Sequence, residues 1–232
     1  MNKTLIATPL KTIADIKEPG YYKVSGVVRI KSPLCFEDFR QDSLDEQLHE
    51  DEDFFDEPLV DYLYVKYRRV NGSRSSTTWV PDSEPRSKSV PFEIVDQTGR
   101  IKIFPEGAEL VRRTLFNKVM GDSITSLKIS NWKQYRIEFS GIKATETVLV
   151  CGRVIADPAS NTLYFGVDGE TKAPDQYFLI SAKTEDELLS ENRQKVKEQV
   201  LIVVCCIIVF VVCGFLALYN HGLSEFRKEN FK

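Results

Sequence analysis

The sequence predicts a mostly β domain followed by one long C-terminal helix. Three observations support this fold class. An uncharged apolar segment covers residues 200–219, and a charged segment that favours a helix, residues 184–199, leads directly into it. Before them, runs of β-branched and aromatic residues alternate with turn signals over residues 21–180. We therefore expect a small OB-like barrel, or an α+β domain with one helix, and then a juxtamembrane helix continuous with a single transmembrane helix.

The apolar segment has the length and composition of a membrane span. Its 20 residues contain no charge and no proline, and 14 of them are Val, Leu, Ile or Phe. A helix of this length is roughly 30 Å long, which matches the hydrocarbon core of a bilayer. Its insertion gains on the order of 6 kcal/mol. A lipid bilayer is therefore the first predicted partner, and we expect a single-pass membrane protein.

The N-terminus and the cysteines predict where the domain resides. The first 17 residues contain no run of seven apolar residues, so we expect no signal peptide and a tail-anchored chain with its domain in the cytosol. Three basic residues stand on each side of the span, so the positive-inside rule does not decide the orientation. Only Cys35 and Cys151 lie outside the span. We expect both to be unpaired thiols in a reducing compartment.

Several segments of the domain have the residue pattern of strands. The predicted strands are 21–31, 59–70, 90–95, 100–104, 135–142, 147–156, 161–166 and 176–180. Gly26 predicts a bulge or a sharp bend in the first of them. Asp96 to Gly99 form a turn signal between the third and the fourth. Residues 105–119 place Leu110, Val111, Leu115 and Val119 near helical spacing, so we expect the helix of the domain there.

These elements divide the chain into five predicted parts. The first is an N-terminal arm, in which Leu10, Ile13 and Ile16 indicate one or two helical turns. Thr184 and Glu187 have capping-box spacing at the start of the juxtamembrane helix. The parts are the arm 1–20, the β-rich domain 21–180, the juxtamembrane helix 181–199, the transmembrane helix 200–219 and a short tail 220–232.

Two long polar loops interrupt the predicted domain. Residues 37–57 contain eleven acids and one arginine, a net charge of −10, and residues 71–88 are rich in Ser and Thr. The acidic loop is open to three interpretations: a solvated linker, a linear motif that docks on a basic groove of a protein partner, or a calcium site. The candidate partner-binding residues are Asp51, Glu52, Asp53, Phe54, Phe55, Asp56 and Glu57.

The sequence predicts no catalytic, cofactor or metal site. Its two histidines are His49, in the acidic loop, and His221, beyond the span. Neither is expected beside a nucleophile, and no phosphate-binding glycine loop occurs. Asp96, Glu138 and Glu146 are the acids that a carboxylate pair would use, but nothing in the sequence brings two of them together. A net charge of −3 gives no indication of a nucleic-acid partner.

The ordered set of segments resembles the BAM (beside-a-membrane) domain of GIDE-type E3 ubiquitin ligases. Residues 24–28 form a V-x-G-x-V strand, and residues 90–110, VPFEIVDQTGRIKIFPEGAEL, are similar to the "PF-x-(hydrophobic)-x-D-x-x-G" segment of the family. Residues 148–154 and then 177–181 precede the acidic helix that leads into the span. The resemblance covers most of residues 20–219 and implies a β-rich domain held at a mitochondrial, plastid or prokaryotic membrane.

The sequence also departs from that family. The ligases carry a transmembrane helix before the domain and a RING after it, and a RING needs eight Cys or His ligands for two zinc ions. Thirteen residues follow residue 219, and they include no cysteine. We therefore expect a non-catalytic binding or scaffold protein and not an enzyme. The alternatives are a RING-less component of a membrane ubiquitin-ligase or quality-control system, and an unrecognised membrane-bound enzyme.

Overall fold

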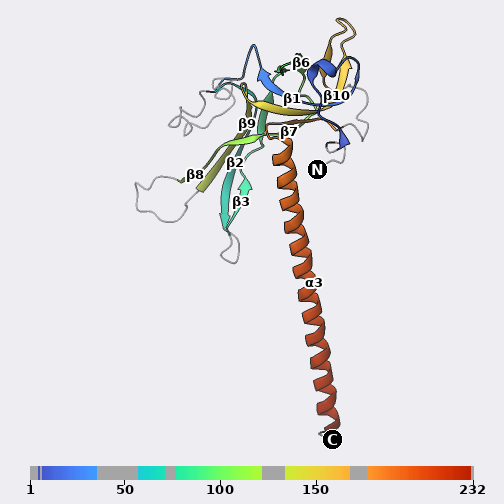
Figure 1. Cartoon of the computed structure of the whole chain (residues 1–232). Helices are drawn as coiled ribbons and strands as arrows, with labels where there is room; N and C mark the ends of the chain where they lie inside the picture. The colour runs from blue at the N-terminus through green and yellow to red at the C-terminus, as the bar shows by residue number, and fades with distance from the viewer. Residues whose placement is uncertain are drawn as a thin grey trace, which may run out of the picture. The chain divides into compact units, whose positions relative to one another are not determined.

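The computed structural model describes residues 5, 7–35, 57–71, 77–121, 134–167 and 177–230, and the statements below concern these residues. The chain divides into two compact units, residues 1–184 and residues 185–232. Figure 1 labels the main strands of the first unit and the one helix of the second.

A closed five-stranded barrel forms one half of the first unit. Its strands are β1 (Gly20–Arg29), β5 (Phe92–Val95), β6 (Arg100–Ile103), β11 (Leu163–Phe165) and β10 (Thr147–Ala156), in that order around the ring. Antiparallel pairing of β1 with β10 closes it, and β11 with β6 is the parallel pair of the ring. Two short strands, β12 (Leu179–Ser181) and β7 (Glu109–Val111), extend the sheet from β10. This topology is compatible with the predicted OB-like barrel.

The barrel closes around an apolar core that the sequence pattern supplies. Residues 148–151 of β10 are all buried, and Val24, Ile94 and Phe165 from neighbouring strands have no exposed surface. The chain thereby removes most of these side chains from water, which is the main favourable term in folding. A short 3₁₀ helix, η1 (Ile13–Asp15), adds Ile13 to this core and fulfils the predicted helical turn of the arm.

Gly26 lies where β1 changes partners. The strand pairs with β10 from Gly20 to Val27 and with β5 from Val27 onward. A Cβ at Gly26 would stand 2.8 Å from the carbonyl oxygen of Val95, so only glycine allows the two backbones to approach this closely. The register is unbroken at Gly26, which makes this position a close approach in the barrel wall and not a bulge.

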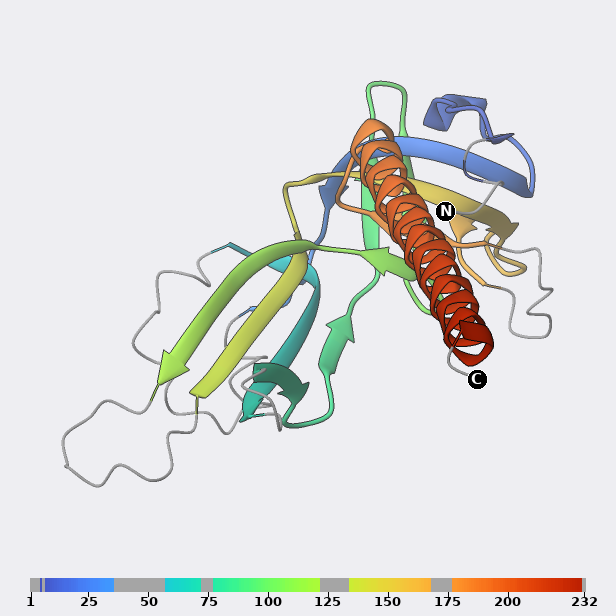
Figure 2. The ribbon, with the colours of Figure 1, turned by 90° about the horizontal axis from the view of Figure 1, so that it is seen from below.

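A second sheet forms the other half of the unit and contains the longest strands. Its members are β2 (Leu59–Asn71), β9 (Gln134–Lys143), β8 (Arg113–Gly121), β3 (Thr77–Pro81) and β4 (Arg86–Ser89). The order is β3-β2-β9-β8, with β4 also paired to β2, and all pairs are antiparallel. In Figure 2, β2, β9 and β8 run side by side as a curved ribbon that extends beyond the barrel.

The two sheets share their buried residues at one end. Val60 of β2 and Ile142 of β9 belong to the barrel core, whereas Tyr62, Tyr64 and Phe139 form a second cluster further along the same strands. Tyr62 stacks on Phe139 with a centroid distance of 5.7 Å. One end of the second sheet therefore packs against the barrel core, and the rest of the sheet packs around its own aromatic cluster.

Two predictions of secondary structure were wrong. Residues 105–119 were expected to be a helix, but they contribute β7 and most of β8. The four apolar residues have helical spacing, yet Thr, Phe and Val in this segment also suit a strand, and pairing with β9 decides the outcome. Residues 71–88 were expected to be a loop. In the part that the structure describes, β3 and β4 pair with β2 instead.

The second unit is one continuous helix, α3 (Glu185–Asn230). It begins directly after Thr184, and its first turn contains Glu185, Asp186 and Glu187, which suit the positive end of the helix dipole. Its apolar window has a mean hydropathy of 2.6 and is long enough to cross a membrane. The predicted continuity of the juxtamembrane and apolar segments is confirmed.

Candidate functional site

The predicted partner-binding residues fall mostly outside the described part of the chain. This applies to Asp51, Glu52, Asp53, Phe54, Phe55 and Asp56, so the predicted motif stays a prediction. Glu57 is described: it is exposed and its carboxylate lies 2.8 Å from Nζ of Lys143. Leu34 and Leu59 exchange two backbone hydrogen bonds of 2.8 and 3.1 Å. Leu34 and Leu59 are thus held side by side at the start of β2.

The three carboxylates considered for catalysis, Asp96, Glu138 and Glu146, each interact with a different set of residues. Glu138 lies 3.6 Å from Arg136, and Glu146 accepts a 2.6 Å hydrogen bond from Nε of Arg113. Asp96 accepts hydrogen bonds from the turn that it begins and from the amide of Ile13. Within the described ranges, no three His, Cys, Asp or Glu side chains gather as a metal site would require.

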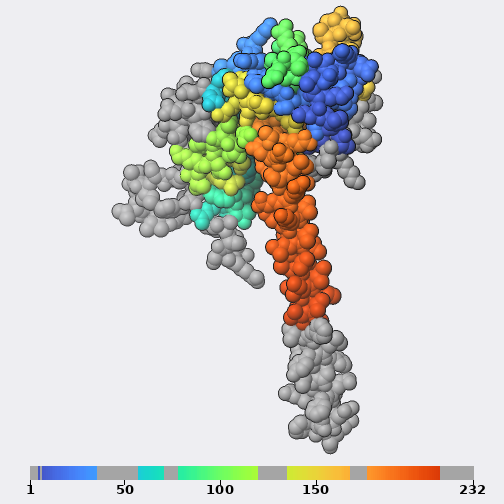
Figure 3. Space-filling view, in the orientation of Figure 1, coloured from blue at the N-terminus to red at the C-terminus, as the bar shows by residue number. Residues whose placement is uncertain are grey.

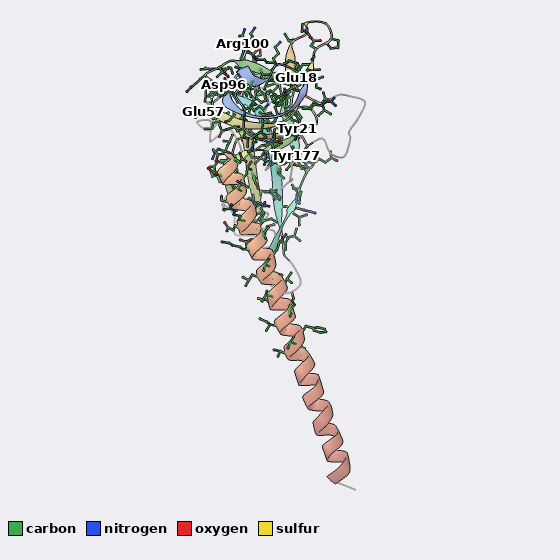
Figure 4. All side chains as sticks on the ribbon, turned by 45° about the vertical axis from the view of Figure 1, so that its right-hand side comes forward. Glu18, Tyr21, Glu57, Asp96, Arg100 and Tyr177 are labelled. Carbon is green, nitrogen blue, oxygen red and sulfur yellow. The ribbon has the colours of Figure 1, made fainter. Side chains whose placement is uncertain are left out.

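A phenol and thiol cluster lies on the barrel wall. The hydroxyl of Tyr21 donates to the carbonyl of Tyr177, and Sγ of Cys151 donates to the Tyr21 oxygen at 3.6 Å. Figure 4 shows Tyr21 and Tyr177 close together. Burial raises the pKa of Tyr21 and of Tyr177 well above the ordinary value, and the nearby Glu109 raises that of Tyr177 further. Both phenols are therefore neutral at physiological pH and unsuited to act as bases.

The second sheet carries a strong positive charge. Its five strands contain nine Lys or Arg residues and two acids, Asp61 and Glu138. Asp61 is buried and engaged on both oxygens: the Arg112 guanidinium forms a two-point ion pair with it, and Ser89 Oγ donates at 2.6 Å. Glu138 is therefore the acid that remains near the surface of these strands. A sheet of this composition favours a partner with negative charge.

Aromatic side chains and an arginine share one face of this sheet. Arg136 of β9 is directly opposite Tyr67 of β2 and Val119 of β8, and residues opposite each other in a sheet point to the same face. Its guanidinium carbon lies 4.5 Å from the ring centroid of Tyr67 and 5.8 Å from that of Trp79 in β3. We call the five residues Tyr67, Trp79, Val119, Arg136 and Glu138 the Arg136 strip.

The strip combines charge with accessible apolar surface. The side chain of Arg136 is 30% exposed, that of Glu138 is 33% exposed, and Val119 is 53% exposed. Nε of Arg136 is buried and has no hydrogen-bond partner. Strands β8 and β3 lie on the surface in the space-filling view (Figure 3). Tyr, Trp and Arg are the residue types that dominate binding energy in protein interfaces, so this face has the composition of a binding surface.

Sequence reasoning missed the strip. It assigned Trp79 to a polar loop and Val119 to a helix, so neither was placed in the same sheet as Arg136. The available signal was the alternation of side chains along β2, which places Tyr67 and Arg69 on one face. Only the register of four strands brings the five residues together.

The fold therefore defines a mostly β domain protein with one helix that is compatible with membrane anchoring. The family model named GIDE, described as E3 ubiquitin ligase, matches residues 64–217, which is more than half of the chain. The chain belongs to the GIDE family, as the resemblance predicted. No curated protein and no solved structure matches.

The family match corrects one prediction. We expected a protein without enzymatic activity, and the family is described as an E3 ubiquitin ligase, which points to such activity. The expectation rested on motifs that were not found in this sequence. A missing motif is a weaker argument than a match that starts in β2 and continues through the β-rich domain into the apolar part of α3.

Proposed function

We propose that this chain acts in ubiquitin transfer at a membrane surface, as a single-pass protein whose β-rich domain binds a protein partner. The observation that carries the proposal is the extent of the family match. Residues 64–217 include the second sheet apart from the first five residues of β2, the barrel strands from β5 onward and most of the apolar segment. The domain and its helix thus belong to one family unit. The proposed parts are those of the sequence analysis, with the domain at 21–180 and the span at 200–219.

The binding role is supported by charges and side chains of the domain. The second sheet is basic, and the Arg136 strip presents aromatic and apolar surface between its charges. We also retain the acidic motif from Asp51 to Glu57 as a proposed second contact. Binding surfaces are commonly carried on a rigid scaffold, and the two sheets provide one. The proposed orientation places the domain in the cytosol, where ubiquitin and its activating enzymes are available.

The direct test is reconstituted ubiquitin transfer on liposomes. The chain of residues 1–232 is inserted in liposomes with activating enzyme, conjugating enzyme, ubiquitin and ATP, with and without a separate RING-bearing protein. We expect the chain to increase the amount of conjugates about tenfold over the control liposomes, either with or without the RING-bearing protein. A tenfold change in rate corresponds to about 1.4 kcal/mol. Liposomes that contain an unrelated single-pass protein are the control. Equal conjugate levels in all four samples would contradict the proposal.

The acidic motif needs a separate test. In-membrane crosslinking and mass spectrometry are applied to the intact protein and to a variant in which Phe54 and Phe55 are changed to Ser. We expect at least one crosslinked protein to be lost in the variant, because aromatic anchors contribute most to such contacts. An identical set of crosslinked proteins in both samples would reduce the segment to a solvated linker.

A further inference from the structure

The Arg136 guanidinium lies beside two aromatic rings and has few polar partners. It lies against the rings of Tyr67 and Trp79, which limit the rotamers that it adopts and keep its plane in place. Among the described residues Glu138 is its ion-pair partner, and the 3.6 Å separation from Nη2 is longer than a good hydrogen bond. Nε has no acceptor. A carboxylate is the acceptor that matches the two-point geometry of a guanidinium.

The surroundings of this guanidinium indicate what accompanies the acid. Val119 stands directly opposite Arg136 on the edge strand β8, with 53% of its surface exposed. Trp79 lies on the other side of the guanidinium and is only partly buried. An incoming segment that places a carboxylate on Arg136 would therefore bring the neighbouring side chains over apolar surface, where an aromatic or large aliphatic group gains most.

We propose that the Arg136 strip binds an acidic segment of a partner protein in which carboxylates flank an aromatic or large apolar side chain. This inference deepens the function proposed above and rests on it for a partner that is a protein. Charge complementarity supports the assignment, since the strands of this sheet hold nine basic residues against two acids. The excess remains positive after counting the acids outside the strands that pair with three of the nine: Glu57 with Lys143, Glu146 with Arg113 and Asp82 with Arg68. The positive sheet attracts the segment, and the strip fixes its position.

Nucleic acid is the less suitable anion for this surface. Proteins that bind single strands stack bases on open aromatic rings. Here the guanidinium of Arg136 lies over the rings of Tyr67 and Trp79, where a base would otherwise stack. Glu138 also lies within the strip and repels a continuous line of phosphates, whereas a peptide with separated carboxylates can avoid it.

The test is a binding measurement on the full chain in nanodiscs of uncharged lipid. The probe is a fluorescent peptide with the sequence DEQLHEDEDFFDE, which is that of residues 45–57 of this chain and has the required acidic and aromatic composition. Binding is followed by fluorescence polarisation. We expect Arg136→Gln to weaken binding about tenfold, because a charge-assisted contact is lost. Arg136→Lys is expected to weaken it less, since the charge stays and the planar fork is removed.

Two matched controls lie on the opposite face of the same sheet, in β2. Arg68 neighbours Tyr67 in β2 and points to the other face with 59% of its side chain exposed, so Arg68→Gln removes the same charge elsewhere. Val119→Asp places a repelling charge in the strip, and Val70→Asp places it on the other face at an exposed position. We expect the two strip variants to lose about tenfold or more and the two controls to change less than twofold.

Three outcomes would overturn the inference. Equal losses for Arg136→Gln and Arg68→Gln would show unspecific attraction to the basic sheet. Tighter binding of a single-stranded oligonucleotide than of the peptide would assign the surface to nucleic acid. If the peptide binds only to a variant in which residues 37–56 are replaced by a Gly-Ser linker, then this segment of the chain itself occupies the Arg136 strip. The measurement contains no ubiquitin, so its failure and the failure of the transfer assay are distinguishable.

Discussion

At the scale of single residues, the buried ion pair between Asp61 and Arg112 joins the two halves of the domain. Asp61 belongs to β2 of the second sheet and is 1% exposed. Arg112 stands between β7, which extends the barrel sheet, and β8 of the second sheet. The neighbouring Arg113 reaches Glu146 and the carbonyl of Ala182, at the end of β12. Two consecutive arginines therefore fix the crossing between the sheets.

We predict that Asp61→Ala destabilises the domain by about 3–5 kcal/mol, because it leaves the largely buried Arg112 charge without its partner. The urea midpoint, followed by tryptophan fluorescence in detergent micelles, measures this loss. The double variant Asp61→Leu with Arg112→Met removes both charges and should recover most of the stability. A single variant that unfolds at the wild-type urea concentration would show that the pair contributes nothing to the fold.

Asp96 gives a second prediction at this scale. Burial raises the pKa of Asp96, but hydrogen bonds from the Thr98 side chain and from the amides of Ile13, Thr98 and Gly99 outweigh it and hold the pKa below the ordinary value. A lowered folded-state pKa means that the stabilisation is present at neutral pH. It is lost as the pH falls from about 4, the unfolded-state value, through the lower folded-state value.

We therefore predict that Asp96→Asn lowers the urea midpoint at pH 6 and that the difference from wild type narrows by pH 3. The expected effect at pH 6 is under about 1 kcal/mol, because the carboxylate is partly solvated. The two proteins are compared at several pH values between 6 and 3. A difference that stays constant over this range would show that the charge of Asp96 does not contribute.

At the scale of elements, most strands were predictable, but β3, β4, β7 and β8 were not, and the helix expected at residues 105–119 is absent. β1, β2, β5, β6, β9 and β10 follow from runs of β-branched and aromatic residues between turn residues, which is local information. Residues 105–119 fit the apolar spacing of a helix and also the residue preferences of a strand. Pairing of β8 with the distant strand β9 decides between the two. The Arg136 strip could not be predicted for the same reason, since its members come from four strands and depend on register.

The close approach at Gly26 yields the prediction at this scale. Gly26→Ala would place Cβ 2.8 Å from a backbone oxygen of β5, which moves only if the barrel wall moves. We predict a loss of about 1–3 kcal/mol in the free energy of unfolding. Gly166→Ala is the matched control, because its nearest atom, at 3.0 Å, is the ring edge of Tyr164, which can rotate away. Equal losses for the two variants would contradict this explanation.

At the scale of the whole molecule, charge is separated along the chain. Residues 37–57 carry −10, and the net charge of −3 leaves +7 for all other residues. Much of the positive charge belongs to the second sheet. An acidic segment and a basic surface in one domain allow selection among charged partners, since each repels what the other attracts. The sequence showed the acidic part directly, whereas the basic part required the pairing of its strands.

The apolar part of α3 was predictable as a helix long enough to span a membrane, because its length and hydrophobicity are local properties of the sequence. Its insertion would gain on the order of 6 kcal/mol, and each arginine at its centre would cost about 2.5–3.5 kcal/mol. Changing Ile208 and Val212 together to Arg should therefore cancel the gain and release most of the protein from membranes in alkaline carbonate. Ser190→Arg with Val196→Arg adds the same charge to the same helix before the apolar segment and should leave the protein in the membrane fraction. Release of both variants to the same extent would mean that the chain is held by something other than residues 200–219.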